Sequence, residues 1–239
     1  MQLMVQLLSV PLLTRSWGLA GYGAWVLLFS VPALLAMADL GLTTAGANEM
    51  TRAVAQGDRP RAARIMMVLR LVTVTAGLAL FALAALAVLV VFPDSLDFGT
   101  ALPRGEAVNT SLLLALYGFL ALLNGVTLAA FRAADAFASS GFIFHNIMLV
   151  EAIAALAVAF LGGSQAQVAL AYLLARLGGT LVLSLALRRH APWLRQASWR
   201  IDRAELSALI RPALAALVLP GAQAVAIQGS VMVLSLIHI

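Results

Sequence analysis

Long runs of hydrophobic residues, separated by short polar stretches, dominate the pattern along the chain. The long runs lie at 22–45, 71–92, 110–131, 142–162 and 167–187. Each run has about the 20 residues that an α-helix needs to cross a bilayer, and none shows the strict alternation of a barrel strand. Residues 2–14 are apolar but short for a span. The pattern therefore predicts a first helix that is clipped at its N-terminus.

These runs predict an all-α fold, a polytopic transmembrane helical bundle. We expect a six-helix bundle over 1–187, a basic linker over 188–211 and a seventh helix over 212–233 that begins a second bundle. The last six residues, LSLIHI, are what CTG TCT CTT ATA CAC ATC encodes, which is a widely used sequencing adapter. We therefore expect 234–239 to be an artefact and the chain to be a fragment.

Composition supports the membrane interpretation. Hydrophobic residues make up 63% of the 239 and charged residues 10%, with a mean hydropathy of +1.00. Soluble domains are about half apolar and a quarter charged. The absence of cysteine excludes a thiol nucleophile and a disulfide scaffold. No P-loop, HExxH or GxSxG motif occurs, so we expect neither enzymatic activity nor a cofactor or metal.

Arginine is concentrated in alternate connections between the runs. The arginine-rich connections are 46–70, 132–141 and 188–211. The connections with little positive charge are 15–21, 93–108 and 163–166. Because an excess of Lys and Arg marks the cytoplasmic side of a membrane protein, we predict that the N-terminus and the arginine-rich connections face the cytoplasm.

The 188–211 segment also carries Trp193 and Trp199 among its arginines. Basic residues interleaved with tryptophan are typical of a helix that lies on an anionic leaflet. We therefore expect this segment to contact the lipid bilayer, and no nucleic-acid partner is expected.

Polar residues inside the spans are candidate site residues, because at membrane depth they usually face a cavity or a partner. Arg176 lies near the middle of the sixth span, one turn after Tyr172, and a guanidinium beside a hydroxyl suits a phosphate or pyrophosphate. The alternative is an arginine paired with Glu151 or Asp39, which are themselves candidates for ion coupling. Asn124 could hydrogen-bond across helices or contact sugar hydroxyls.

Several stretches near the N-terminus resemble the N-terminal signature of polysaccharide flippases. They are PLLTRSWG at 11–18, YGAW at 22–25 and ADLGL at 38–42. The stretches ANEM at 47–50 and AVAQGD at 53–58 are similar to the first cytoplasmic loop of the same family. These are the Wzx-type exporters of O-antigen and exopolysaccharide, within the multidrug/oligosaccharidyl-lipid/polysaccharide (MOP) exporter superfamily.

The resemblance implies a MATE-like fold of about twelve to fourteen helices in two bundles. It also implies a cationic cavity for the head group of a polyprenyl-pyrophosphate-linked oligosaccharide, which alternating access carries across the bacterial inner membrane for polysaccharide or lipopolysaccharide biosynthesis. A coupling ion, H⁺ or Na⁺, would drive the cycle. On this mapping Arg176 contacts the pyrophosphate, Arg15 receives the head group near the periplasmic mouth, and Asp39 and Glu151 couple ions or hold Arg176.

Other classes of protein remain open. A multidrug exporter of the same superfamily would share the fold and have a less cationic cavity. A non-transporting membrane scaffold would use Arg176 and Glu151 as a structural pair. A membrane-embedded polysaccharide enzyme would need a catalytic cluster, which the sequence does not show.

Overall fold

The structure is a computed structural model, and it describes residues 2–37, 41–86, 88–89 and 102–196. Within these residues every regular element is helical, which confirms the all-α prediction. The helices are α1 (Gln2–Met37), α2 (Leu42–Ala55), α3 (Arg59–Leu86), α4 (Arg104–Ala133), α5 (Phe137–Phe160), α6 (Gln165–His190) and the short 3₁₀ helix η3 (Pro192–Gln196). The predicted seventh helix, the last six residues and Asp39 lie outside the described residues.

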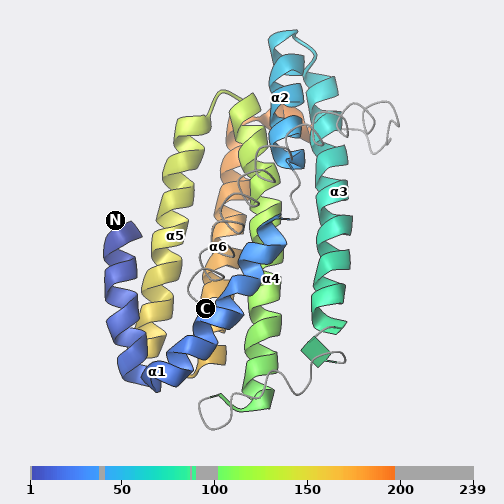
Figure 1. Cartoon of the computed structure of the whole chain (residues 1–239). Helices are drawn as coiled ribbons and strands as arrows, with labels where there is room; N and C mark the ends of the chain where they lie inside the picture. The colour runs from blue at the N-terminus through green and yellow to red at the C-terminus, as the bar shows by residue number, and fades with distance from the viewer. Residues whose placement is uncertain (1, 38–40, 87, 90–101, 197–239) are drawn as a thin grey trace, which may run out of the picture.

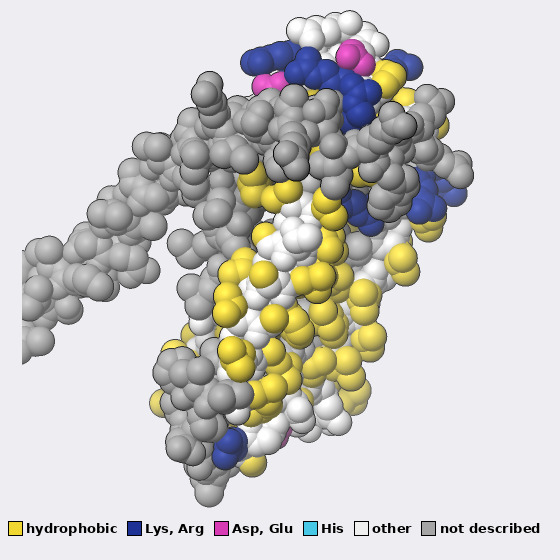
Figure 2. Space-filling model, turned by 90° about the vertical axis from the view of Figure 1, so that its right-hand side faces the viewer, with side chains coloured by type: hydrophobic (Ala, Val, Ile, Leu, Met, Phe, Trp, Pro, Cys, Tyr) yellow, Lys and Arg dark blue, Asp and Glu magenta, His cyan; other side chains and the backbone are white. Residues whose placement is uncertain are grey.

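Four helices, α3 to α6, are long and apolar enough to cross a membrane, judged by length and composition. They lie side by side in Figure 1. Their outer faces expose large apolar side chains such as Leu83 of α3, Ile153 of α5 and Leu181 of α6. Figure 2 shows hydrophobic side chains covering one flank of the bundle. Helices that are apolar on their outer as well as their inner faces are typical of membrane spans, so the chain has the features of a multi-pass membrane protein.

The first two predicted apolar segments form one helical element with a break. Gly18 has φ 73° and ψ 173° inside α1. This left-handed φ is open to glycine because glycine lacks a Cβ. The chain turns back at this point, so that α1 has two arms: the first arm runs beside α5 and the second crosses α4 (Figure 1). Residues 2–14 lie in the first arm, which the non-helical Gly18 separates from the second.

The connection 46–70, expected as a cytoplasmic loop, is mostly helical. It holds most of α2 and the beginning of α3, joined by a turn in which Gly57 has φ 80°. Met50 and Ala53 of α2 are buried, and they belong to the same core cluster as Leu69 of α3. Between its arginines this segment carries apolar residues at helical spacing. These residues form an apolar face, so the segment packs as part of the bundle.

Most of the charged side chains of the described residues lie at the two ends of the bundle. One end, the arginine-rich end, is formed by α2, the start of α3, the α4–α5 turn and the end of α6. Its arginines include Arg52, Arg59, Arg61, Arg132, Arg188 and Arg189. The opposite end, the kink end, holds Gly18, the α5–α6 turn and the start of α4, with Arg15, Arg104 and Glu106. Figure 2 shows most of the visible Arg side chains at one end, with a smaller group at the opposite end. The described parts of the arginine-rich connections thus lie at one end of the bundle, and those of the other connections lie at the opposite end. That the arginine-rich end faces the cytoplasm stays a prediction.

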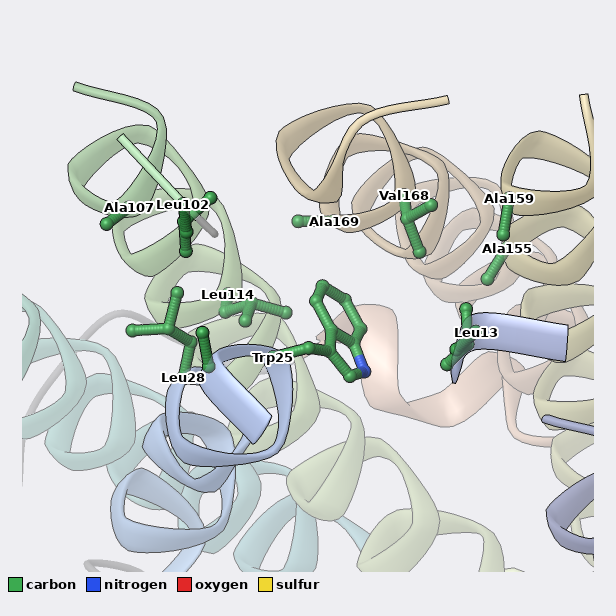
Figure 3. Close-up of a cluster of buried hydrophobic side chains, with 11 residues drawn as sticks. Leu13, Trp25, Leu28, Leu102, Ala107, Leu114, Ala155, Ala159, Val168 and Ala169 are labelled. Atoms are coloured by element: carbon green, nitrogen blue, oxygen red, sulfur yellow. The ribbon is translucent and has the colours of Figure 1, made fainter. Parts of the chain in front are cut away.

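Tryptophan side chains are packed at both ends of the bundle. At the kink end Trp25 is 5% exposed and lies among Leu28, Leu114 and Val168 (Figure 3). At the arginine-rich end Trp193 is half-buried against the core and does not lie free on a surface. Trp199, the other tryptophan of the expected surface segment, lies outside the described residues.

Candidate functional site

Arg176 and Glu151 form an ion pair inside the bundle. Arg176 of α6 is 4% exposed and Glu151 of α5 is 2% exposed. Nη2 of Arg176 donates to Oε2 of Glu151 at 2.7 Å, and Nε lies 2.7 Å from Oε1 as an ionic contact without hydrogen-bond alignment. Burial of a lone charge in apolar surroundings would be strongly unfavourable, so each residue offsets the burial of the other. Of the partners considered for Arg176, the structure places Glu151 against it.

Tyr117 of α4 completes this network. Its hydroxyl accepts a hydrogen bond from Nη2 of Arg176 at 2.5 Å and donates one to Oε2 of Glu151 at 3.1 Å. The guanidinium carbon of Arg176 also lies 4.5 Å from the centroid of the Tyr117 ring and 5.9 Å from that of Phe144. Guanidinium groups are attracted to aromatic faces at these distances. Three helices, α4, α5 and α6, therefore meet at one charged point.

A close approach of α5 and α6 makes the pair possible. Gly179 lies three residues after Arg176 and shares its helix face. A Cβ at Gly179 would lie only 2.4 Å from Cγ2 of Ile147, so only glycine fits there without movement. Ile147 is one turn before Glu151 on α5. The contact between Gly179 and Ile147 thus brings the Glu151 carboxylate within reach of Arg176.

Tyr172 links the charged network to aromatic side chains of α1. The rings of Tyr172 and Tyr117 meet edge to face with centroids 5.7 Å apart. The Tyr172 ring also lies 5.3 Å from the Phe29 ring and 6.3 Å from the Trp25 ring. These separations are typical of favourable aromatic pairs. The predicted neighbour of Arg176 therefore stands between the ion pair and the second arm of α1.

A cavity of about 330 Å³ lies beside these rings, lined by both arms of α1 together with α5 and α6. Its lining includes Leu13, Trp25, Phe29, Ala155 and Tyr172. Ala155 comes one turn after Glu151 on α5, and Tyr172 comes one turn before Arg176 on the antiparallel α6. The cavity consequently lies on the kink-end side of the ion pair.

Two hydrogen bonds fasten the break in α1 to the α5–α6 turn. Nε1 of Trp17 donates to the Gly163 carbonyl at 3.0 Å. Nε2 of Gln165 donates to the Gly21 carbonyl at 2.8 Å. We call these two bonds the kink latch. They fix the residues on both sides of Gly18 and so hold the two arms of α1 around the cavity.

The other predicted site residues are not brought to the ion pair. Arg15 is exposed near the break in α1 and is not part of the cavity lining. Asn124 lies two turns beyond Tyr117 on α4, is 1% exposed, and its side chain makes no hydrogen bond to the described residues. Asp39, the remaining candidate, is outside the described residues.

Sequence reasoning missed Tyr117, Trp25 and Phe29. The sequence does carry a signal for Trp25 and Phe29, because they and Tyr22 repeat at the helical spacing and share one face of α1. Nothing local marked Tyr117, whose partners lie 34 and 59 positions away in the chain.

Within the described part of the chain, no group of three or more His, Asp or Glu side chains is placed to hold a metal ion. The chain matches no protein-family model, no curated protein and no solved structure.

Proposed function

We propose that the protein is a membrane transporter that moves a polyprenyl-pyrophosphate-linked oligosaccharide between leaflets by alternating access. The observation that carries this proposal is the Arg176–Glu151 pair in the middle of α5 and α6, beside a cavity lined by aromatic rings. Ionisable groups at membrane depth commonly mark the pathway of a substrate or an ion. The resemblance of the N-terminal stretches to polysaccharide flippases favours a lipid-linked sugar as the substrate and the bacterial inner membrane as the location.

The pair offers a way to accept and release an anionic head group. Arg176 carries a permanent charge and can bind a phosphate with two parallel hydrogen bonds. Glu151 now occupies that position, so a pyrophosphate would have to displace the carboxylate. Tyr117 contacts both groups and would keep the guanidinium in place during the exchange. A displaced Glu151 is the candidate carrier of the coupling ion, H⁺ or Na⁺.

The same exchange would link binding to a movement of helices. The ion pair is a direct polar contact between α5 and α6, and Tyr117 ties both to α4. A ligand shifts a conformational equilibrium only by its different affinity for the two states. A head group that takes the place of Glu151 favours the state in which α5 and α6 are no longer joined by this pair.

Transfer of a fluorescent polyprenyl-pyrophosphate-N-acetylglucosamine between the leaflets of reconstituted vesicles tests the proposal. The full-length native protein should move the probe. The double variant Glu151→Gln, Arg176→Gln should slow this movement about tenfold or more. This double variant leaves no unpaired buried charge, so it is expected to fold. The matched control is Arg70→Gln, which removes a cation from the exposed face of α3. Native transport by the folded double variant would rule out the site, and failure of the native protein to move the probe would rule out the function.

A second candidate, multidrug export, is favoured by a different observation. Glu151 neutralises Arg176, and the cavity wall is mainly aromatic and aliphatic. Such a wall suits a flat, apolar cation, because aromatic faces attract positive charge. The same vesicles should therefore be tested with ethidium under an ion gradient. Dye movement without movement of the lipid-linked sugar would select the exporter.

A further inference from the structure

We propose that the cavity between the two arms of α1 is a subsite for a sugar ring, with the indole N–H of Trp25 as its hydrogen-bond donor. This inference rests on the proposed function, and it names the part of the lipid-linked oligosaccharide that the cavity accepts. The ion pair one turn away is assigned to the pyrophosphate, and the cavity is assigned to the first sugar.

Trp25 lines the cavity, and its indole N–H has no hydrogen-bond acceptor among the described residues. Trp25 is 5% exposed, and its ring packs against Trp17, Phe29 and Tyr172. Trp17 donates its N–H to the Gly163 carbonyl, whereas among the described residues no acceptor is placed on the Trp25 nitrogen. Figure 3 shows the nitrogen-bearing edge of Trp25 on the side of Leu13, which lines the cavity. Buried indole groups usually find a hydrogen-bond partner, so a ligand oxygen in the cavity would supply the missing acceptor.

The remaining wall has the mixed character that a sugar ring needs. A sugar presents apolar C–H faces, which pack on aromatic rings, and a polar rim of hydroxyl groups. The cavity lining includes the aromatic residues Tyr22, Phe29 and Tyr172, and Ser30, whose hydroxyl donates to the Leu27 carbonyl and can still accept a hydrogen bond. Its volume of about 330 Å³ lies at the lower end of the range for small-ligand sites. The space therefore suits one or two sugar rings and not a long oligosaccharide.

The position of the cavity matches the order of groups in the substrate. Tyr172, in the cavity wall, precedes Arg176 by one helical turn, which is about 6 Å along the axis of α6. A pyrophosphate at Arg176 would thus place the sugar bonded to it on the kink-end side, inside the cavity. A hydrocarbon chain in the same space would leave the Trp25 donor unsatisfied, and a buried unsatisfied donor is unfavourable. The sugar is therefore the favoured occupant.

Binding measurements with matched probes test this assignment. The protein in lipid nanodiscs is titrated with farnesyl-pyrophosphate-N-acetylglucosamine and with farnesyl pyrophosphate, which lacks the sugar. The sugar should increase affinity, and Trp25→Phe should remove about five- to tenfold of affinity for the sugar-bearing probe alone, the effect of one lost hydrogen bond. Trp193→Phe, at the arginine-rich end, is the control and should bind both probes as the native protein does.

Two additions keep the result clear. Leu13→Phe fills the cavity while retaining Trp25, and it should also remove the sugar-dependent gain. A second pair of probes, farnesyl N-acetylglucosaminide and farnesol, lacks pyrophosphate. If only the pyrophosphate-free sugar probe binds, and does so through Trp25, the subsite stands and the proposed function falls. If the sugar adds no affinity in either pair, or if Trp25→Phe weakens all probes equally, the subsite is overturned and the cavity is a pocket for an apolar chain.

Discussion

Arg176 exchanges the hydration that its charge would have in water for a carboxylate, a phenol hydroxyl and an aromatic face. Such an exchange is balanced only while all partners are present. Removing one member of a buried pair leaves an uncompensated charge, whereas removing both is often nearly neutral. Glu151 and Arg176 are therefore strongly coupled in stability, whatever their part in transport.

A double-mutant cycle measures this coupling. Glu151→Gln and Arg176→Gln should each lower the free energy of unfolding by about 3–5 kcal/mol, because each leaves its partner charged and unpaired. The double variant should lose clearly less than the sum of the two single losses. Unfolding in detergent micelles, followed by circular dichroism, gives the values, and Arg70→Gln is again the control. Additive losses would show that the two side chains do not interact.

The sequence identified the charged half of the site but not the aromatic half. Arg176 and Glu151 stand out because an ionisable residue in an apolar run is rare and unfavourable without a partner. An isolated run could not show which charges face each other, so pairing and anion binding were both open for Arg176. Trp25 and Tyr117 could not be assigned because an aromatic side chain in an apolar span has no distinctive local signal. Their place depends on contacts far apart in the chain.

At the level of helices, glycine decides how closely neighbours approach. A Cβ at Gly118 of α4 would come within 3.0 Å of the Pro32 Cα of α1, and one at Gly179 of α6 would collide with Ile147 of α5. Helices that associate in lipid depend on such close packing, since lipid supplies no hydrophobic driving force between them. The small residues therefore set the geometry in which the ion pair forms.

Two adjacent glycines of α6 provide a matched comparison. Gly179→Ala should destabilise the bundle by about 1–3 kcal/mol, because the new methyl group overlaps Ile147 and pushes α5 away. Gly178→Ala should be neutral or stabilising by about 0.5–1 kcal/mol, because nothing lies within 4 Å of its Cβ position and alanine favours the helix. Thermal unfolding of both variants in the same detergent gives the comparison. Equal effects would mean that α5 and α6 are not in close contact at Gly179.

Hydropathy predicted the existence of the long helices better than their ends. The run 167–187 lies within α6, which begins at Gln165 because Ser164 and Gln167 form a capping box. The run 22–45 was too long, because helix α1 ends at Met37 and Gly41 adopts φ 71° before α2. The break at Gly18 falls in the predicted connection 15–21, although hydropathy alone does not show which residue of that connection turns the chain.

Charge is distributed unequally between the two ends of the whole molecule. The connections rich in arginine are joined in space by α2 and η3, which pack on the same end of the spans. In a bacterial inner membrane an end of this kind faces the cytoplasm. We therefore predict that the arginine-rich end is cytoplasmic and that the kink end is periplasmic.

The absence of cysteine makes this orientation easy to measure. Gln56→Cys places a thiol at the exposed α2–α3 turn, and Leu161→Cys places one at the α5–α6 turn, where the native side chain is 82% exposed. In intact spheroplasts a membrane-impermeant maleimide should label only the Leu161→Cys protein. The Gln56→Cys protein should react only after the membrane is opened. The reverse labelling pattern would invert the topology, and labelling of both from one side would contradict the spanning arrangement.

The kink latch also sets an order in time. Trp17 finds its acceptor 146 positions later in the chain, and the Gly21 carbonyl finds its donor 144 positions later. The ribosome therefore releases the turn at Gly18 long before either partner has been synthesised. Until Gly163 and Gln165 reach the membrane, the two arms of α1 lack the two hydrogen bonds of the kink latch. Helix α1 is thus synthesised well before the residues that lock it in place, and a chain that stops before residue 163 retains α1 without its latch.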